Sequence, residues 1–236
     1  MIYKIFPIFF LLLSSFSPRE IKTTNPKPIA YTSVKSDIEL KVENIYNQLH
    51  SNDLLMPNLN SFSKALVGFY DLKAKGLVSK DILTLIDFSL SSNTKRLWVI
   101  DLTSNTILYQ SLVAHGRNTG DEFANSFSNA AESYKSSLGF YATGEIYNGK
   151  HGTSLKLDGL EKGINDNART RAVVMHGADY VAESFIKNNH RLGRSLGCPA
   201  LPVAMTKAIV NAIKGKSCLY IYHPSLDKKS AARLLS

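Results

Sequence analysis

The stretch Arg194-Ser195-Leu196-Gly197-Cys198-Pro199-Ala200 says most about the fold and chemistry of this chain. It places a cysteine among glycine and proline, which suit an exposed turn better than the interior of a strand. Upstream, the apolar run Val173-Val174-Met175 ends in His176-Gly177. A histidine at a strand end lies at the rim of a sheet, where functional sites are often built. The two residues together predict thiolate chemistry, because an imidazole can take the thiol proton and leave a nucleophile.

Each of these residues also has an ordinary structural interpretation. Many cysteines are buried structural thiols, and a histidine at a strand end is usually a polar residue whose hydrogen bonds are satisfied. The flanking Gly193, Gly197 and Pro199 favour the interpretation of Cys198 as a nucleophile. Cys218 lies in an apolar run of strand character and is predicted to be a buried structural thiol. A disulfide between Cys198 and Cys218 is not favoured, because it would silence the nucleophile.

From His176 to Cys198 the sequence resembles the catalytic core of the L,D-transpeptidases, the cysteine enzymes that cross-link bacterial peptidoglycan. Their pattern is a histidine with a small residue, a spacer, and then Ser/Thr-His-Gly-Cys, which His176-Gly177 and Ser195-Leu196-Gly197-Cys198 match in order. The sequence is most similar to a divergent, YkuD-like branch with Ser-x-Gly-Cys-Pro-Ala, over roughly residues 82–224. Leu196 replaces the second histidine, Pro199-Ala200 replaces an apolar residue followed by Arg or Asn, and the spacer is slightly long. These departures leave open how the substrate is held and which acceptor is preferred.

The resemblance implies a role for each residue of the motif. Cys198 would be the nucleophile and His176 the general base. The backbone carbonyl of Gly177 would orient the imidazole, so that no carboxylate is required, with Asp179 as a minor candidate.

Three neighbours of the cysteine are further candidates. Backbone N–H groups near Gly197 and Cys198 would form an oxyanion hole, whose donors contribute about 3–4 kcal/mol each in comparable enzymes. We expect Ser195 to hydrogen-bond within the turn and Arg194 to meet a substrate carboxylate. Ordinary loop roles explain both of these residues at least as well.

Two other segments are candidates for substrate binding. Ser137 and Gly139 lie in a Ser-Ser-Leu-Gly stretch that resembles the Thr-Pro-x-Gly stretch ahead of the family's catalytic core. Tyr147 and His151 lie in the segment 147–167, which is predicted to form a loop or flap over the cleft. The alternative is that both segments are plain turns.

A metal site built from His115, His151 and His176 is not favoured. No cysteine–histidine pair has the spacing of a structural zinc site, and the sequence has no HExxH motif. The resembling enzymes need neither a metal nor an organic cofactor, and we expect none here.

Residues 1–17 have a basic start, a short apolar core and small residues near the end, which predict a signal peptide. The apolar core is too short to span a bilayer comfortably. Residues 18–35, with three prolines, are predicted to be a flexible linker, and the protein is expected in the periplasm or cell envelope.

The formal net charge of +9 favours an anionic wall or membrane surface as partner, or else a solvated basic surface. Nucleic acid is not expected, because the chain has no module that binds it.

The hydrophobic pattern predicts a mainly β fold with a few helices, of the α+β class. Two amphipathic helices form an accessory segment over residues 36–81, with apolar stripes that begin at Ile38 and Phe62. A β-rich domain follows over residues 82–224, which the resemblance implies to be a β-sandwich-like catalytic domain, and residues 225–236 form a tail. The predicted strands of the domain over residues 82–224 are residues 82–88, 97–102, 107–114, 139–143, 154–157, 172–176 and 219–222. Two more helices are predicted, one capped by Asp179 and the other opened by Pro202.

The resemblance therefore implies an exported peptidoglycan L,D-transpeptidase that works through a thioester on Cys198 and acts on stem peptides. Such enzymes are also acylated by carbapenem β-lactams. Two alternatives stay open. One is an L,D-carboxypeptidase, in which water replaces the amine acceptor, and the other is a non-catalytic protein that binds the cell wall.

Overall fold

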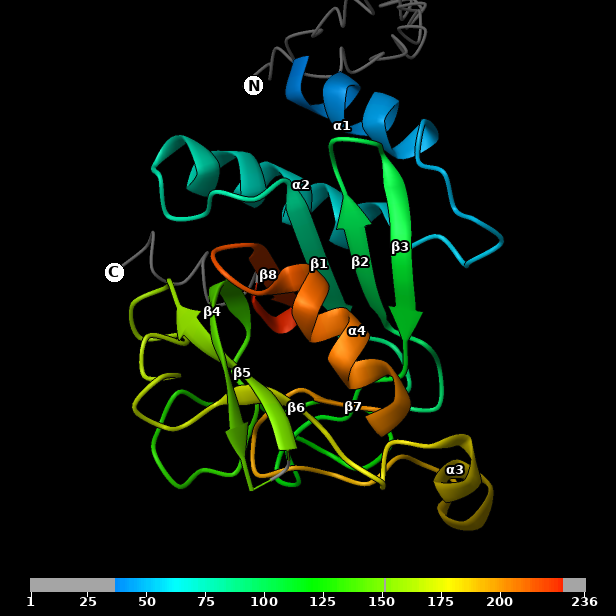
Figure 1. Cartoon of the computed structure of the whole chain (residues 1–236), viewed down its shortest axis with the longest axis vertical. Helices are drawn as coiled ribbons and strands as arrows, with labels where there is room; N and C mark the ends of the chain where they lie inside the picture. The colour runs from blue at the N-terminus through cyan, green and yellow to red at the C-terminus, as the bar shows by residue number, and fades with distance from the viewer. Residues whose placement is uncertain (1–36, 151, 227–236) are drawn as a thin grey trace, which may run out of the picture. The chain divides into compact units, whose positions relative to one another are not determined.

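The computed structural model describes residues 37–150 and 152–226. The predicted signal peptide, the predicted linker and most of the predicted tail lie outside these residues. The helices are α1 (Asp37–Asn47), α2 (Leu59–Ala74), α3 (Glu183–Asn189) and α4 (Val203–Ile213) (Figure 1). The strands are β1 (Ile82–Asp87), β2 (Leu97–Asp101), β3 (Thr106–Ser111), β4 (Gly139–Gly149), β5 (Gly152–Gly159), β6 (Val174–Gly177), β7 (Ala200–Leu201) and β8 (Cys218–Tyr222).

These eight strands form one mixed sheet in the order β3-β2-β1-β8-β4-β5-β6-β7. Two of the neighbouring pairs are parallel, β1 with β8 and β6 with β7, and the others are antiparallel. α2 packs on β1 and β8, whereas α4 packs on β1, β5 and β6 (Figure 1). The predicted α+β class with N-terminal helices is confirmed.

The buried faces of the N-terminal helices match the predicted apolar stripes, except at the start of α1. Asn58 caps α2 through its side-chain oxygen, which accepts the N–H of Asn60 at 2.9 Å. The predicted stripe of α2, from Phe62 to Leu72, is buried. The prediction is wrong for Ile38, which is 53% exposed, whereas Val42, one turn later in α1, is buried.

Two predictions about the catalytic domain differ from the structure. The segment 147–167 was predicted to be a loop or a flap, and its first half is not a loop but part of the β4–β5 hairpin, in which Tyr147 pairs with Ser154. Asp179 was expected to cap a helix, but α3 begins only at Glu183. The backbone is still extended at Ala182, the residue before α3, and Val181 is buried in a small apolar cluster.

Most of the apolar core lies between the sheet, α2 and α4. The small cluster lies where β7 meets the residues that follow β3 and β6, and includes Ala114, Ala178 and Ala200. Small side chains at these positions let the backbones of three segments approach closely around the cysteine turn. No helix in the described ranges is both long and apolar enough to cross a membrane.

Candidate active site

The β6–β7 pairing places Cys198 beside the histidine strand. His176 lies opposite Ala200, and Gly177 opposite Leu201, in parallel register. Two residues earlier, the same register brings Cys198 level with Val174, whose N–H donates to Sγ at 3.4 Å. The thiol lies 3.7 Å from the carbonyl oxygen of Ala172, and its side chain is partly exposed. A backbone donor at the sheet edge therefore points at the sulfur.

His176 lies on β6, two residues beyond Val174, which is about 7 Å along an extended strand. Its side chain is buried, and Nδ1 lies 2.9 Å from the carbonyl oxygen of Gly177. A carbonyl oxygen can only accept, so Nδ1 carries the proton and Nε2 keeps its lone pair. The expected contact with the Gly177 carbonyl is present, and it leaves Nε2 as the basic nitrogen.

Gly177 has a second function that the sequence did not indicate. A Cβ at this position would lie 2.7 Å from Oγ1 of Thr206 and 3.4 Å from Cα of Val203. Both of these residues belong to α4. The missing side chain therefore lets α4 pack directly on the end of β6, next to His176.

Ser195 organises the cysteine turn, as expected. Its Oγ donates to the carbonyl of Cys198 at 2.7 Å and accepts the N–H of Gly197 at 3.0 Å. The N–H of Gly197 is thus already occupied, which argues against its predicted function as an oxyanion donor. The N–H of Cys198 has no acceptor within the described residues, so it is the better candidate.

Two loops support this turn from outside. The hydroxyl of Ser136 accepts the N–H of Gly116 at 3.0 Å and donates to the carbonyl of Gly197 at 3.0 Å. Gly197 has φ +127°, and a Cβ there would lie 2.9 Å from the carbonyl oxygen of Lys135. The turn after β3 and the loop before β4 thus meet at the cysteine.

Arg171 was not predicted from the sequence, yet its guanidinium lies at the centre of these loops. Nη1 donates to the carbonyl of Ser128 at 2.9 Å and to Oγ of Ser137 at 2.6 Å, and Nη2 donates to the carbonyl of Lys135 at 2.8 Å. A Cβ on Gly197 would lie only 3.5 Å from Nη2. Arg171 therefore fixes the loop that supports the cysteine turn.

Three influences act on the thiol. Burial raises the pKa of Cys198, and this effect outweighs the other two. The N–H of Val174 and the positive charge of Arg171 both lower that pKa, because they favour the thiolate. The thiol is therefore held in its protonated form until a base takes the proton.

The candidates Ser137 and Gly139 face the protein interior. Ser137 is buried and donates to the carbonyl of Ser128 at 2.8 Å. Gly139 has φ +97°, and a Cβ there would overlap the carboxylate of Glu161. The structure thus places both residues in the support of the loop, on the side away from the solvent.

Tyr147, in contrast, shares a hollow with residues that contact the cysteine. It lines a hollow of about 300 Å³ together with Ala172 and Val174, the two residues whose backbones contact the thiol. Lys156 reaches over the Tyr147 ring, with Nζ 5.7 Å from its centroid. His151, the other candidate of this segment, lies outside the described residues.

Arg194 does not extend into open solvent. Its Nη1 donates to Oδ1 of Asp121 at 2.6 Å and to the carbonyl of Gly120 at 3.1 Å. These contacts join the cysteine turn to the loop that follows β3.

His115 is a structural residue of the interior. Arg96 donates to its Nδ1 at 2.8 Å, and its Nε2 lies 3.3 Å from the carbonyl of Gly120. Burial and the charge of Arg96 lower the pKa of His115 to about 4. No group of three metal-binding side chains occurs among the described residues.

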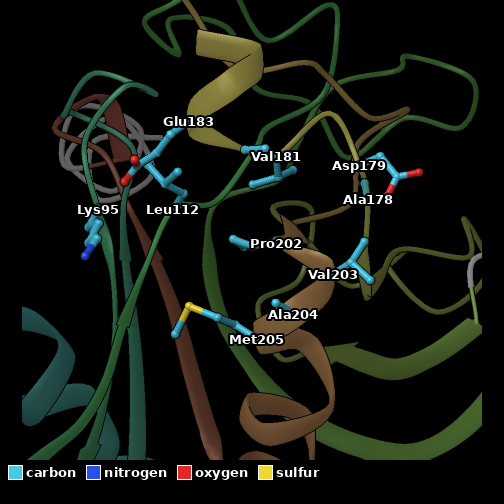
Figure 2. Close-up of a pocket in the computed structure, with 11 residues that line it drawn as sticks. Lys95, Leu112, Ala178, Asp179, Val181, Glu183, Pro202, Val203, Ala204 and Met205 are labelled. Carbon is cyan, nitrogen blue, oxygen red and sulfur yellow. The ribbon is translucent and has the colours of Figure 1, made fainter. Parts of the chain in front are cut away.

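A larger hollow of about 420 Å³ lies at the start of α4 and is lined mainly by apolar side chains (Figure 2). Asp179, the minor candidate for orienting the imidazole, lies at its edge with an exposed side chain. Neither Cys198 nor His176 lines this hollow. The larger of these two hollows therefore does not mark the position of the thiol.

A family model described as the L,D-transpeptidase catalytic domain matches residues 55–222, a range that holds α2 and all eight strands. No curated protein matches the chain significantly. Among solved structures, an L,D-transpeptidase from Mycobacterium smegmatis aligns at 10% identity and TM-score 0.37, over 61% of this chain and 59% of the other. L,D-transpeptidase 3 from Mycobacterium tuberculosis aligns at 10% identity and TM-score 0.39, over 61% of each chain.

A third similar structure is the helical cell shape determining protein from Campylobacter jejuni. It aligns at 14% identity and TM-score 0.41, over 66% of this chain and 53% of the other. The chain thus spans less than two thirds of the length of these solved relatives.

Proposed function

The chain belongs to the L,D-transpeptidase catalytic domain family, and from this premise we propose that it is an exported enzyme that cross-links peptidoglycan stem peptides through Cys198. The single observation that carries this proposal is the 2.9 Å contact between Nδ1 of His176 and the carbonyl oxygen of Gly177. Its Nδ1–H is committed to the Gly177 carbonyl, so its Nε2 is a base on the strand that holds the thiol. Residues 1–17, which lie outside the described residues, would supply the export signal.

The proposed reaction has two halves. In the first, Nε2 of His176 takes the thiol proton, and the thiolate of Cys198 attacks the carbonyl of the L-to-D peptide bond in a stem tetrapeptide. The N–H of Cys198 would stabilise the oxyanion of the tetrahedral intermediate. The intermediate collapses, His176 returns its proton to the leaving amine, and D-alanine departs. A thioester remains on Cys198.

In the second half, an amine from a neighbouring stem peptide attacks the thioester while His176 removes a proton from it. The new amide is the cross-link, and the thiol is regenerated. The same nucleophile would open the ring of a carbapenem and keep it as a thioester. These steps use only groups that the chain itself provides.

The test is incubation of the mature protein with tetrapeptide-containing muropeptides, followed by mass spectrometry of the products. We expect cross-linked dimers and free D-alanine. Free tripeptide without dimer would instead identify an L,D-carboxypeptidase. Unchanged substrate and retained binding to cell walls would identify a wall-binding protein.

Cys198→Ala is expected to reduce turnover to background, because no other nucleophile replaces the sulfur. The matched control is Cys218→Ala, which removes the buried thiol of β8 and should keep turnover. If Cys198→Ala kept full turnover, the proposed nucleophile would be wrong.

A further inference from the structure

A shallow surface cleft of about 370 Å³ lies beside the cysteine turn. Its lining consists of Arg117, Tyr180, Phe185, Arg191, Gly193 and Arg194, and we refer to it as the arginine cleft. Two aromatic side chains and three guanidinium groups make a surface suited to a peptide that carries negative charge.

The cleft has an excess of positive charge. Asp121 is shared by two of the arginines, with Oδ1 2.6 Å from Nη1 of Arg194 and 3.8 Å from Nε of Arg191. Arg117 has no acidic partner among the described residues, and its guanidinium lies 4.5 Å from the centroid of the Tyr134 ring. Asp121 thus pairs with two of the three arginines, and no carboxylate of the described residues pairs with the third. The positive charge of the arginine cleft therefore exceeds its paired negative charge.

The cleft is joined to the cysteine turn by backbone contacts. The N–H of Arg117 donates to the carbonyl of Ser195 at 2.8 Å, three residues before Cys198. The Tyr180 ring lies against Gly193, where a Cβ would approach the tyrosine to 2.3 Å.

The pKa of Tyr180 also depends on the charge of Cys198. Burial, and then the charge of Cys198 in its thiolate form, raise the pKa of Tyr180 to about 12. Together with the backbone hydrogen bond from Arg117 to Ser195, this indicates that the arginine cleft adjoins the turn that carries the sulfur.

Building on the proposed function, we propose that the arginine cleft binds a carboxylate of the peptide substrate. Arg117 and Arg191 would supply the charge, while Arg194 is held by Asp121 and fixes the floor. Stem peptides end in a free carboxylate and carry further ones on their side chains, and guanidinium groups bind carboxylates in well-defined geometry. Bound there, the carboxylate would hold the scissile carbonyl near Cys198.

The first test needs no turnover. It compares the rates at which Cys198 is alkylated by iodoacetate, an anion, and by neutral iodoacetamide, with the modified residue identified by mass spectrometry. The ratio of the two rates reports the local charge, because any change in the reactivity of the thiol affects both reagents equally. Cys218 serves as the buried, unreactive thiol in the same molecule.

At low ionic strength we expect the ratio of iodoacetate to iodoacetamide rates to fall about two- to fourfold in Arg117→Gln and in Arg191→Gln. Arg117→Lys keeps the charge and should keep the ratio. The control Lys207→Gln removes an exposed charge of α4 outside the cleft and should change nothing. An unchanged ratio in the double variant Arg117→Gln/Arg191→Gln would overturn the proposal.

The second test identifies the carboxylate. Acylation of the enzyme is measured with a stem tetrapeptide, with its C-terminal amide and with its side-chain amide. The arginine variants should raise KM severalfold for peptides that keep the recognised carboxylate and leave KM unchanged for the analogue that lacks it. A KM that rises equally for all three peptides would contradict carboxylate recognition. Normal alkylation ratios with no acylation by any peptide would contradict the proposed function alone.

Discussion

At Cys198, burial opposes ionisation, whereas one backbone N–H and one guanidinium support it. Because burial prevails, the resting site holds a thiol, and in the proposed reaction the thiolate forms when His176 takes the proton. A neutral thiol would protect the sulfur between the proposed turnovers. It also makes the rate of any thiol reaction sensitive to small changes in the charge around it.

Arg171→Gln is expected to raise the pKa of Cys198 further, because it removes a positive charge that favours the thiolate. The measurement is the pH profile of iodoacetamide alkylation, which should move to higher pH with a severalfold lower rate at pH 7. Arg171→Lys should restore part of the profile, since it keeps the charge but not the forked contacts. Lys187→Gln, on the exposed side of α3, is the control. A profile that Arg171→Gln leaves in place would show that the guanidinium has only a structural function.

The residues that belong to a motif could be chosen from the sequence, and their catalytic roles stay predictions. Cys198, His176 and Gly177 were identified in this way, and the hydrogen bond to the Gly177 carbonyl was expected. Arg171 was not, because its acceptors are scattered over residues 128–137 and no spacing connects them to it. The positive φ of Ala172, +53°, whose carbonyl oxygen lies 3.7 Å from the thiol, was not predicted either.

At the scale of elements, the site depends on the junction of β6, β7 and α4. β7 has only two residues, Ala200 and Leu201, too few for any periodic pattern, and it was not predicted. The β4–β5 hairpin was predicted as shorter strands with a loop, because glycine and asparagine near Gly149 resemble loop residues. In the structure they belong to the hairpin end. Long, strongly patterned elements such as α2 were predicted correctly.

Gly177→Ala is expected to lower the free energy of unfolding by about 1–3 kcal/mol, because the added methyl group presses on Thr206 of α4. Denaturant unfolding measures this change. Thr206→Ala removes the contacted Oγ1 and provides the matched background. In that background, Gly177→Ala should lower the free energy of unfolding by a clearly smaller amount. Equal costs in both backgrounds would show that the contact with α4 is not the cause.

At the scale of the whole molecule, a buried polar pair connects the sheet to the loops of the site. Arg96, which is fully buried, donates to His115 and to the carbonyls of Leu90 and Val113. The α+β class followed from the order of helical and strand patterns, but this pair did not. Arg96 follows a loop and His115 follows a strand, and nothing in the sequence pattern indicates that their side chains contact each other inside the protein.

The pair predicts acid sensitivity. The pKa of His115 is lowered to about 4 in the folded protein, below its ordinary value of 6.5. The folded state therefore binds fewer protons than the unfolded state, so stability is full above pH 6.5 and is lost as the pH falls through 4. This group contributes about 3 kcal/mol to that loss. Urea unfolding of His115→Gln, measured from pH 7.5 to 4, should show a shallower decline than the parent protein. An equal decline in both proteins would contradict this origin of the acid sensitivity.

The position of Cys218 has a consequence for oxidative damage. β8 and β7, the strand that follows Cys198, are separated by β4, β5 and β6, which places the two sulfur-bearing backbones about 19 Å apart across the sheet, whereas a disulfide needs Cα atoms within about 7 Å. These are the only cysteines of the chain. A sulfenic acid formed on Cys198 by peroxide thus has no resolving thiol in the same molecule. Its recovery depends on a small-molecule or protein reductant supplied by the surroundings.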